Sequence, residues 1–233
     1  MTRIISFRPE EKFENRPHGM DIKNIPLTRI REIEDIPEPD WNGISGIAFM
    51  STTSVNFFLK RFGKYPLKNL KVFSIGNKTM DLLNENNIES NMPEIHNSNG
   101  LASLICNSLE EGSSVLIPRN MTHTDVLTDK LSECGIKGIN IYLYAYDEID
   151  SSHDISMESK TPDFIGFVFT SPEEVRIFKR ITGNQYNKMK FFPIGTETER
   201  ELRKNGFQNI PFVGKGNFDE LITKIMENSG EWI

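Results

Sequence analysis

The sequence has few of the residues that build metal centres and disulfide frameworks. The two cysteines are Cys106 and Cys134, and the four histidines are His18, His96, His123 and His153. Neither a CxxC nor an HExxH spacing occurs, so the patterns typical of metal sites are missing. We therefore expect no metal, no disulfide framework and a reducing compartment, the cytoplasm. Cys106 is expected to be a thiol in the core.

Long apolar runs and an excess of basic charge are also missing. No run approaches the roughly 18–20 residues that span a bilayer, and the N-terminus lacks the apolar stretch of a signal peptide. Lysine and arginine total 27 against 33 aspartates and glutamates, which gives a net charge of −6. This balance argues against nucleic-acid and membrane partners, while a local basic pocket for an anionic small molecule is compatible with it. Without a long exposed apolar stripe, we expect a monomer.

The sequence alternates between strand and helix patterns. Hydrophobic residues make up 37% of the 233 residues, enough for a core in one or two domains. Short β-rich runs are followed by apolar residues at helical spacing, as at Val55, Phe58 and Phe62. This alternation predicts the α/β class with parallel sheets. The expected strands are residues 3–9, 43–51, 71–76, 114–120, 138–146, 163–171 and 188–195. Two polar segments, 34–41 and 146–163, are expected to be surface connections.

The sequence also contains an internal repeat. IAFMSTTSVNFFLKRF (47–62) resembles FVFTSPEEVRIFKRIT (167–182), and KVFSIGNKTMDLLNENNIES (71–90) resembles KFFPIGTETERELRKNGFQN (190–209). A third pair, 99–109 and 216–226, follows in the same order and at nearly the same separation. The repeat therefore predicts two similar α/β domains.

The order of the remaining strands predicts that one domain is inserted in the other. Residues 114–120 close the first copy, whereas their counterpart 3–9 opens the chain, and 139–144 likewise corresponds to 24–30. One domain then consists of residues 1–30 and 148–233, and the inserted domain of residues 37–142. The connections, 31–36 and 143–147, would form a two-stranded hinge. Clefts between domains joined in this way are common ligand sites.

Polar residues recur at equivalent strand ends of the two copies, where ligands bind to parallel sheets. They are Ser51 and Ser171, Gly76 and Gly195, Thr79 and Thr198, and Arg8 and Arg119. Each Ile-Gly turn opens a helix whose first N–H groups can bind an anion. Singly, such a serine or threonine is more often a helix cap than a ligand contact. The doubled arrangement favours ligand binding, and the absence of GxGxxG and GxxxxGK[ST] patterns disfavours a nucleotide.

Tyr144 is the candidate for acid–base chemistry. It lies at the expected domain connection and shares one face of a strand with Tyr142 and Tyr146. A tyrosine with an ordinary pKa of about 10 is protonated at neutral pH and can donate a proton to a leaving group. The alternative is that all three rings pack against neighbours.

Together these blocks resemble the uroporphyrinogen-III synthase family. The most specific pieces are VFTSPEEV (168–175), FFPIGTETERELRKNGF (191–207), FSIGNKTMDLLNENNI (73–88), and VLIPRN followed by IYLYAY. The resemblance implies two α/β domains, one inserted in the other and joined by a two-stranded β-ladder. In place of the family's usual helix after the first strand, residues 13–24 are short and contain Pro17 and Gly19, so that helix is expected to be truncated or missing.

The resemblance also implies a lyase of porphyrin biosynthesis, on the route to haem, sirohaem or cobalamin. Its substrate would be hydroxymethylbilane, a linear tetrapyrrole with eight carboxylates, which loses water and closes with inversion of ring D to give uroporphyrinogen III. No cofactor or metal is implied. Tyr144 would assist departure of the hydroxyl group, and Thr79, Thr198, Ser51 and Ser171 match family positions at the turns and strand ends.

A negatively charged protein that binds a polyanion must concentrate positive charge locally. Arg8, Arg119, Lys64 and Lys215 are the candidates. The alternative to the enzyme is a non-catalytic two-domain hinge protein that binds an anionic small molecule. Tyr144 discriminates between the two, because a binding protein needs no proton donor at the hinge.

Overall fold

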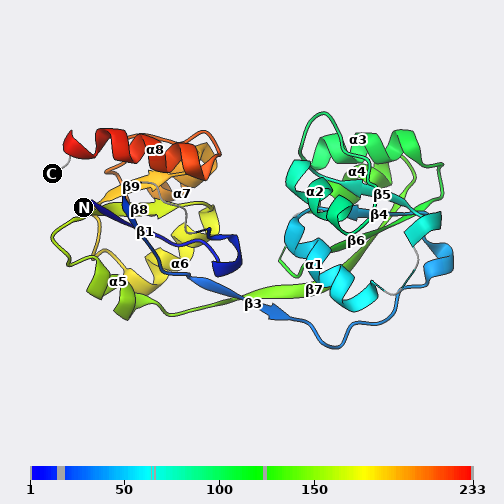
Figure 1. Cartoon of the computed structure of the whole chain (residues 1–233), viewed down its shortest axis with the longest axis horizontal. Coiled ribbons are helices and arrows are strands. Elements are labelled where there is room, and N and C mark those ends of the chain that lie inside the picture. Colours follow the sequence, from blue (N-terminus) through cyan, green and yellow to red (C-terminus); the bar gives the residue numbers. More distant parts are fainter. Residues whose placement is uncertain (1, 15–18, 64, 66, 123–124, 232–233) are drawn as a thin grey trace. The chain divides into compact units, whose positions relative to one another are not determined.

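A computed structural model describes residues 2–14, 19–63, 65, 67–122 and 125–231 (Figure 1). Contacts between residues divide the chain into two compact units. Unit 1 consists of Met1–Arg29 and Asp147–Ile233, and unit 2 of Ile30–Tyr146. The chain therefore crosses between the units twice, at Arg29/Ile30 and at Tyr146/Asp147.

Unit 1 is built on a parallel sheet with the strand order β2-β1-β8-β9. The strands are β1 (Arg3–Ser6), β2 (Asp21–Asn24), β8 (Phe164–Phe169) and β9 (Lys190–Pro193). The helices are α5 (Ser152–Glu158), α6 (Pro172–Thr182), α7 (Thr196–Lys204) and α8 (Phe218–Asn228). One short 3-10 turn, Glu10–Lys12, separates β1 and β2 among the described residues, in agreement with the expected loss of a helix there.

Alternating side chains of these strands form two cores, one on each face of the sheet. Ile5 and Phe7 pack with residues of α5, α6 and α7, including Phe178. Ile4 points to the opposite face and packs with α8, including Ile222. Because both faces are covered, the strands are continuously apolar, as parallel strands usually are.

Unit 2 repeats this architecture, with the strand order β3-β7-β6-β4-β5. Its strands are β3 (Thr28–Glu32), β4 (Gly46–Phe49), β5 (Lys71–Ser74), β6 (Ser114–Asn120) and β7 (Lys137–Glu148). Its helices are α1 (Thr52–Phe62), α2 (Asn77–Glu85), α3 (Ser98–Ser108) and α4 (Val126–Glu133). α1 and α2 pack on the sheet face that carries Ile47 and Phe49, and α3 and α4 on the face that carries Ala48.

The two sheets share one strand order. When the order β2-β1-β8-β9 of unit 1 is aligned with β7-β6-β4-β5 of unit 2, β1 corresponds to β6. The internal repeat predicts this correspondence, because it pairs residues 3–9 with residues 114–120. The predicted parallel α/β class is confirmed. The expected strand 24–30 is wrong in detail, because the chain forms β2 before it and β3 at its end. Pro26, which cannot donate to a ladder, lies in the interval between the two strands.

Residues 146–163 are not only a connection, because they include α5. The helix buries Ile155 completely in the core of unit 1. Ser151, just before the helix, donates its hydroxyl to the Pro26 carbonyl at 2.8 Å. The few apolar residues of this polar segment give no periodic pattern, so this helix depends on tertiary contacts that the sequence does not reveal.

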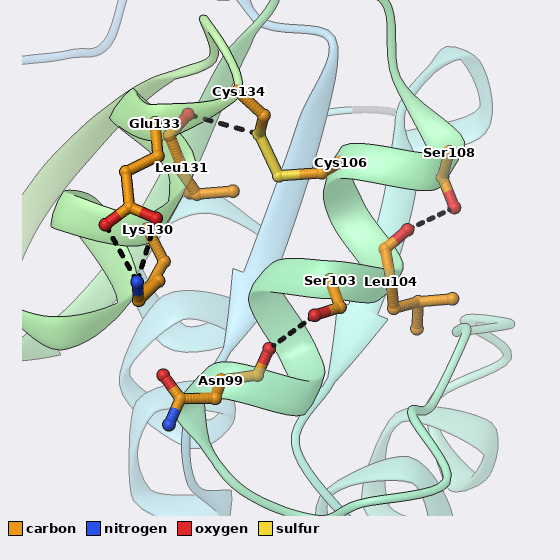
Figure 2. The surroundings of a disulfide bond; sticks show 9 residues. All are labelled: Asn99, Ser103, Leu104, Cys106, Ser108, Lys130, Leu131, Glu133 and Cys134. Atoms are coloured by element: carbon orange, nitrogen blue, oxygen red, sulfur yellow. Dashed lines mark hydrogen bonds and ion pairs between the residues drawn. A yellow bond between two sulfur atoms is a disulfide. The ribbon is translucent and has the colours of Figure 1, made fainter.

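Cys106 and Cys134 form a disulfide, which corrects the expectation of no disulfide and of a core thiol (Figure 2). Cys106 lies in the last turn of α3, and Cys134 directly follows α4. The two helices pack side by side on one face of the sheet, which brings the two Cα atoms to 6.1 Å. This Cα–Cα distance is within the range that a disulfide bridges. The sequence does not indicate the pairing, because the two cysteines are 28 positions apart.

Candidate active site

The register of neighbouring strands brings the candidate residues of each sheet to the same edge. In unit 2, Phe49 of β4 lies opposite Ser74 of β5, and Ser51 and Gly76 each follow two residues later. In unit 1, Phe169 of β8 lies opposite Pro193 of β9, and Ser171 and Gly195 follow in the same way. Each sheet therefore presents a serine and a glycine side by side at its carboxyl edge.

The Ser51 hydroxyl has two contacts at this edge of unit 2. Ser51 is the N-cap of α1, and its Oγ accepts a hydrogen bond from the Ser54 N–H at 3.1 Å. The same Oγ lies 3.4 Å from the Tyr144 hydroxyl, and either group can donate. The helix-cap and ligand-contact interpretations of Ser51 therefore do not exclude each other.

The Tyr144 ring is held rigidly by its neighbours. The residue is 5% exposed, and its ring stacks on Phe57 with centroids 5.0 Å apart. Tyr146 contacts it edge-on at 5.8 Å. Strand pairing fixes the backbone as well, because the Tyr144 carbonyl accepts from the Met121 N–H at 2.9 Å. These contacts hold the Tyr144 hydroxyl beside Ser51, and a proton donor requires such fixed positioning.

Arg119 supplies a buried positive charge near Tyr144. It lies at the end of β6, is 7% exposed, and donates from Nη1 to the Asn140 Oδ1 at 3.0 Å. Burial lowers the pKa of its guanidinium, while electrostatic interactions with Asp125, Tyr142 and Tyr144 oppose that shift. An arginine stays charged under these conditions, so this edge of unit 2 carries a cation in a poorly hydrated environment.

The Ile-Gly turn of unit 2 combines an open helix start with a buried hydroxyl group. Gly76 is the N-cap of α2 in extended conformation, with φ −173°, so no backbone strain requires glycine there. A side chain at this position would meet His96 at 3.6 Å, an ordinary contact. Thr79 is 4% exposed, and within the described residues its hydroxyl makes no hydrogen bond, so it is available to a ligand.

The corresponding turn of unit 1 has the same construction. Gly195 is the extended N-cap of α7, and a Cβ at this position would meet nothing within 4 Å. Thr198 is 2% exposed, and its hydroxyl also lacks a hydrogen-bond partner in the part of the chain that the structure describes. Lys215 lies beside this turn, because the N–H groups of Gly214 and Gly216 donate to the carbonyls of Pro193 and Ile194.

Glu174 is a buried carboxylate that the sequence analysis missed. Ser171, the N-cap of α6, accepts from the Glu174 N–H at 3.2 Å. The Glu174 carboxylate accepts in return from the Thr170 N–H at 2.5 Å and from the Thr170 hydroxyl at 2.6 Å. Burial raises the pKa of Glu174, against the effect of these hydrogen bonds and of the Arg8 charge. The spacing of Ser171 and Glu174 is that of a capping box, which was the available signal.

Arg8 lies at the same edge of unit 1. Its guanidinium stacks over the Phe218 ring, 4.5 Å from the centroid, at the start of α8. Burial lowers the pKa of Arg8, while the charges of Glu174, Asp219 and Glu14 raise it. The Asn24 side chain donates to the Arg8 carbonyl at 3.0 Å. Arg8 is thus a half-buried cation that an aromatic ring helps to hold in place.

Some sequence candidates lie outside the described residues, namely Lys64, His18 and His123. In the described ranges no three histidine, cysteine or acidic side chains gather as metal ligands would. Over the same ranges, every helix falls short of the length or the apolarity that crossing a bilayer requires.

Comparison with known proteins identifies the family. The family model described as uroporphyrinogen-III synthase HemD matches residues 13–217. A curated uroporphyrinogen-III synthase of Chlorobaculum parvum is 26% identical over 226 residues, which cover 89% of this chain and 91% of the relative. Among solved structures, uroporphyrinogen-III synthetase of Helicobacter pylori has a TM-score of 0.71 at 16% identity, over 98% of this chain and all of that one.

The structure of a mutant uroporphyrinogen III synthase from Thermus thermophilus has a TM-score of 0.65 at 14% identity. The match covers 99% of this chain and 100% of the Thermus thermophilus chain. At these identities the two solved structures establish a common fold. The match of the family model extends over most of the sequence, and the chain therefore belongs to the uroporphyrinogen-III synthase family.

Proposed function

We propose that this chain converts hydroxymethylbilane into uroporphyrinogen III, with loss of water and inversion of ring D, and that Tyr144 is its proton donor. One observation supports the assignment of Tyr144 as the proton donor. The Tyr144 hydroxyl lies 3.4 Å from the Ser51 hydroxyl at the carboxyl edge of unit 2, near the buried Arg119. Membership of an enzyme family favours this function over the alternative, a binding protein without catalysis.

Tyr144 acts where the ring A hydroxymethyl group loses its hydroxyl as water. The phenol donates its proton to the departing oxygen, and the lone pair of the pyrrole nitrogen assists the departure. Ser51 can donate to the phenol oxygen as its proton leaves, because the two oxygens are already 3.4 Å apart. The charge of Arg119 stabilises the negative charge that develops on that oxygen. This chemistry requires neither a cofactor nor a metal.

The substrate carboxylates bind at the carboxyl edge of each sheet. The first N–H groups of α2 and α7 start at Gly76 and Gly195, and each helix end favours negative charge. Thr79 and Thr198 add a hydroxyl donor to each of these turns. Ser171 contributes to the same edge in unit 1, where its Oγ also caps α6.

Basic side chains strengthen carboxylate binding at the same edges. Arg8 and Lys215 serve unit 1, and Arg119 serves unit 2. Arg8 and Arg119 are partly or fully buried, so a carboxylate that reaches them forms a charge-assisted hydrogen bond with little competition from water. Lys215 is exposed and contributes mainly at long range.

We also propose that residues 37–142 form an inserted domain between the two parts of the other domain, 1–30 and 148–233. Residues 31–36 and 143–147 would be the hinge. The division into units at Arg29/Ile30 and Tyr146/Asp147 supports this arrangement. So do the bonds from the Ile33 N–H to Leu143, at 3.0 Å, and from the Ile149 N–H to Leu27, at 2.9 Å. The monomeric state and the cytoplasmic location stay predictions.

The function is tested by an isomer assay. Hydroxymethylbilane is generated in place by a separate enzyme, purified protein is added, and the oxidised products are separated into type I and type III isomers. Spontaneous closure gives type I, so a dominant type III product supports the proposal. Type I alone, from protein that is folded by circular dichroism, would contradict it.

A further inference from the structure

The disulfide of unit 2 lies where solvent and other molecules can reach it. Both cysteines are half-buried. They line a surface groove of about 660 Å³ together with Ser103, Lys130 and Glu133. Figure 2 shows the sulfur–sulfur bond joining the ends of two helices, with the Lys130–Glu133 ion pair on the neighbouring turn. A disulfide that reagents reach can exchange with thiolates, whereas one sealed in a core cannot.

We propose that Cys106–Cys134 is a reversible redox site whose reaction partner is a dithiol reductant. One thiolate of the reductant attacks a sulfur of the pair, the bond between Cys106 and Cys134 breaks, and the released thiolate takes a proton from water. The second thiolate of the reductant then attacks the mixed disulfide and releases the other cysteine, which is also protonated. Two electrons pass from the dithiol to the protein, and the reductant leaves as a disulfide.

The fold accommodates the reduced pair. The Cys134 sulfur lies 3.2 Å from the Leu131 carbonyl oxygen, so the thiol formed on reduction has an acceptor for its hydrogen. α3 and α4 also share an apolar core that does not involve the sulfur bond, with Ile105 and Leu131 fully buried in it. Reduction therefore removes a crosslink and leaves the apolar core shared by α3 and α4 in place.

The crosslink stabilises unit 2 mainly by restricting its unfolded chain. It closes a segment with a sequence separation of 28, which contains β6 and α4. A loop of this length is expected to shift the melting temperature of a domain of this size by about 10 °C when it is opened. Oxidised and reduced protein should therefore differ clearly in thermal stability.

The redox site lies at the edge of unit 2 opposite the candidate active site. α3 and α4 each precede a strand, β6 and β7, so the carboxyl ends of these helices lie at the amino ends of the strands. The Gly112 N–H donates to the Gly135 carbonyl at 2.9 Å and joins the two helix-to-strand turns. Ser51 and Arg119 lie at the carboxyl ends. Reduction should therefore change stability and leave turnover at moderate temperature unchanged.

The test is thiol labelling of the native protein followed by mass spectrometry. We expect no alkylation of air-oxidised protein by iodoacetamide, and two alkyl groups after brief treatment with dithiothreitol. The melting temperature should fall by about 10 °C on reduction and recover on reoxidation. Two reactive thiols in the air-oxidised protein would overturn the proposal. So would a disulfide that dithiothreitol reduces only after the protein has been unfolded.

A variant separates the crosslink from other effects of the reductant. In the double variant Cys106→Ser, Cys134→Ser, dithiothreitol should not change the melting temperature, which should lie near that of the reduced wild-type protein. A reductant-dependent shift in this variant would contradict the assignment. The labelling experiment uses the wild-type chain and remains decisive if the variant does not fold.

Discussion

Replacing Tyr144 by phenylalanine tests the proposed proton donor with little structural change. Phenylalanine keeps the ring that stacks on Phe57 at 5.0 Å and loses only the hydroxyl. The hydrogen bond to Ser51 is long at 3.4 Å, so its loss should change the free energy of unfolding by less than about 1 kcal/mol. Tyr144→Phe is therefore expected to affect the reaction far more than the fold.

The expected loss of turnover is about 10–100-fold, at the lower end of what a positioned acid contributes. It corresponds to roughly 1.4–2.7 kcal/mol of transition-state stabilisation. The loss stays moderate because the pyrrole nitrogen helps to expel the hydroxyl group and because water can replace the phenol as a donor. The assay is kcat measured under saturating hydroxymethylbilane, with the ratio of type III to type I product as a second reading.

Tyr186→Phe is a matched control for Tyr144→Phe. Tyr186 is buried in unit 1 at 4% exposure, against 5% for Tyr144. Its hydroxyl also contacts a serine, Ser159, at 3.4 Å, and it accepts in addition from the Gln185 side chain at 3.3 Å. The control removes the same atom from an equivalent contact outside the candidate site, so its kcat should be unchanged. Equal turnover in wild type and Tyr144→Phe, or equal losses in the two variants, would refute the role of Tyr144.

Three further predictions concern the binding groups and the buried carboxylate. Thr79→Val and Thr198→Val should each lower kcat/KM by about 10–100-fold, the value of a hydrogen bond to a charged group, without loss of stability in urea unfolding. Lys215→Gln should raise KM a few-fold, and less so at high salt, because an exposed charge is screened. Glu174→Gln should flatten the pH dependence of stability. Burial raises the pKa of Glu174, so its protonated form is favoured in the folded protein. Glu174 therefore contributes most to the free energy of unfolding below the pKa that it has in the unfolded chain. This contribution is lost as the pH rises through its pKa in the folded protein.

The controls for these predictions come from equivalent side chains elsewhere. Thr223→Val removes a hydroxyl that donates to the Asp219 carbonyl in α8, and kcat/KM should not change. Loss of folding in Thr79→Val would support a purely structural role for that hydroxyl. For Glu174, urea unfolding from about pH 4.5 to about pH 8 is compared between wild type and variant. Wild-type stability that rises over this range relative to Glu174→Gln would contradict the stated sign.

The sequence was most informative where structure repeats. Two copies of a strand, a serine and a turn predicted both sheets and the edge at which Ser51 and Ser171 lie, because local patterning determines strands and helix caps. The disulfide was not predictable, since it depends on α3 and α4 packing against one face of a sheet. α5 was missed because a single side chain, Ile155, anchors it. The Glu174 contacts required knowledge of burial, although the capping-box spacing was visible.

The two sheet edges differ in chemistry despite their common construction, and this difference predicts a division of roles. The edge of unit 2 carries Tyr144 and a buried cation, Arg119, whereas in unit 1 the hydroxyl of Thr170 is already bonded to Glu174. Unit 1 therefore offers binding groups such as Thr198 at this edge, and its buried carboxyl group, Glu174, is occupied by hydrogen bonds to Thr170. Thr198→Val should act mainly on KM, and Tyr144→Phe on kcat, in steady-state measurements over a range of substrate concentrations. If Thr198→Val lowers kcat as strongly as Tyr144→Phe does, the substrate groups held in unit 1 must take part in the transition state, and this division of roles is wrong.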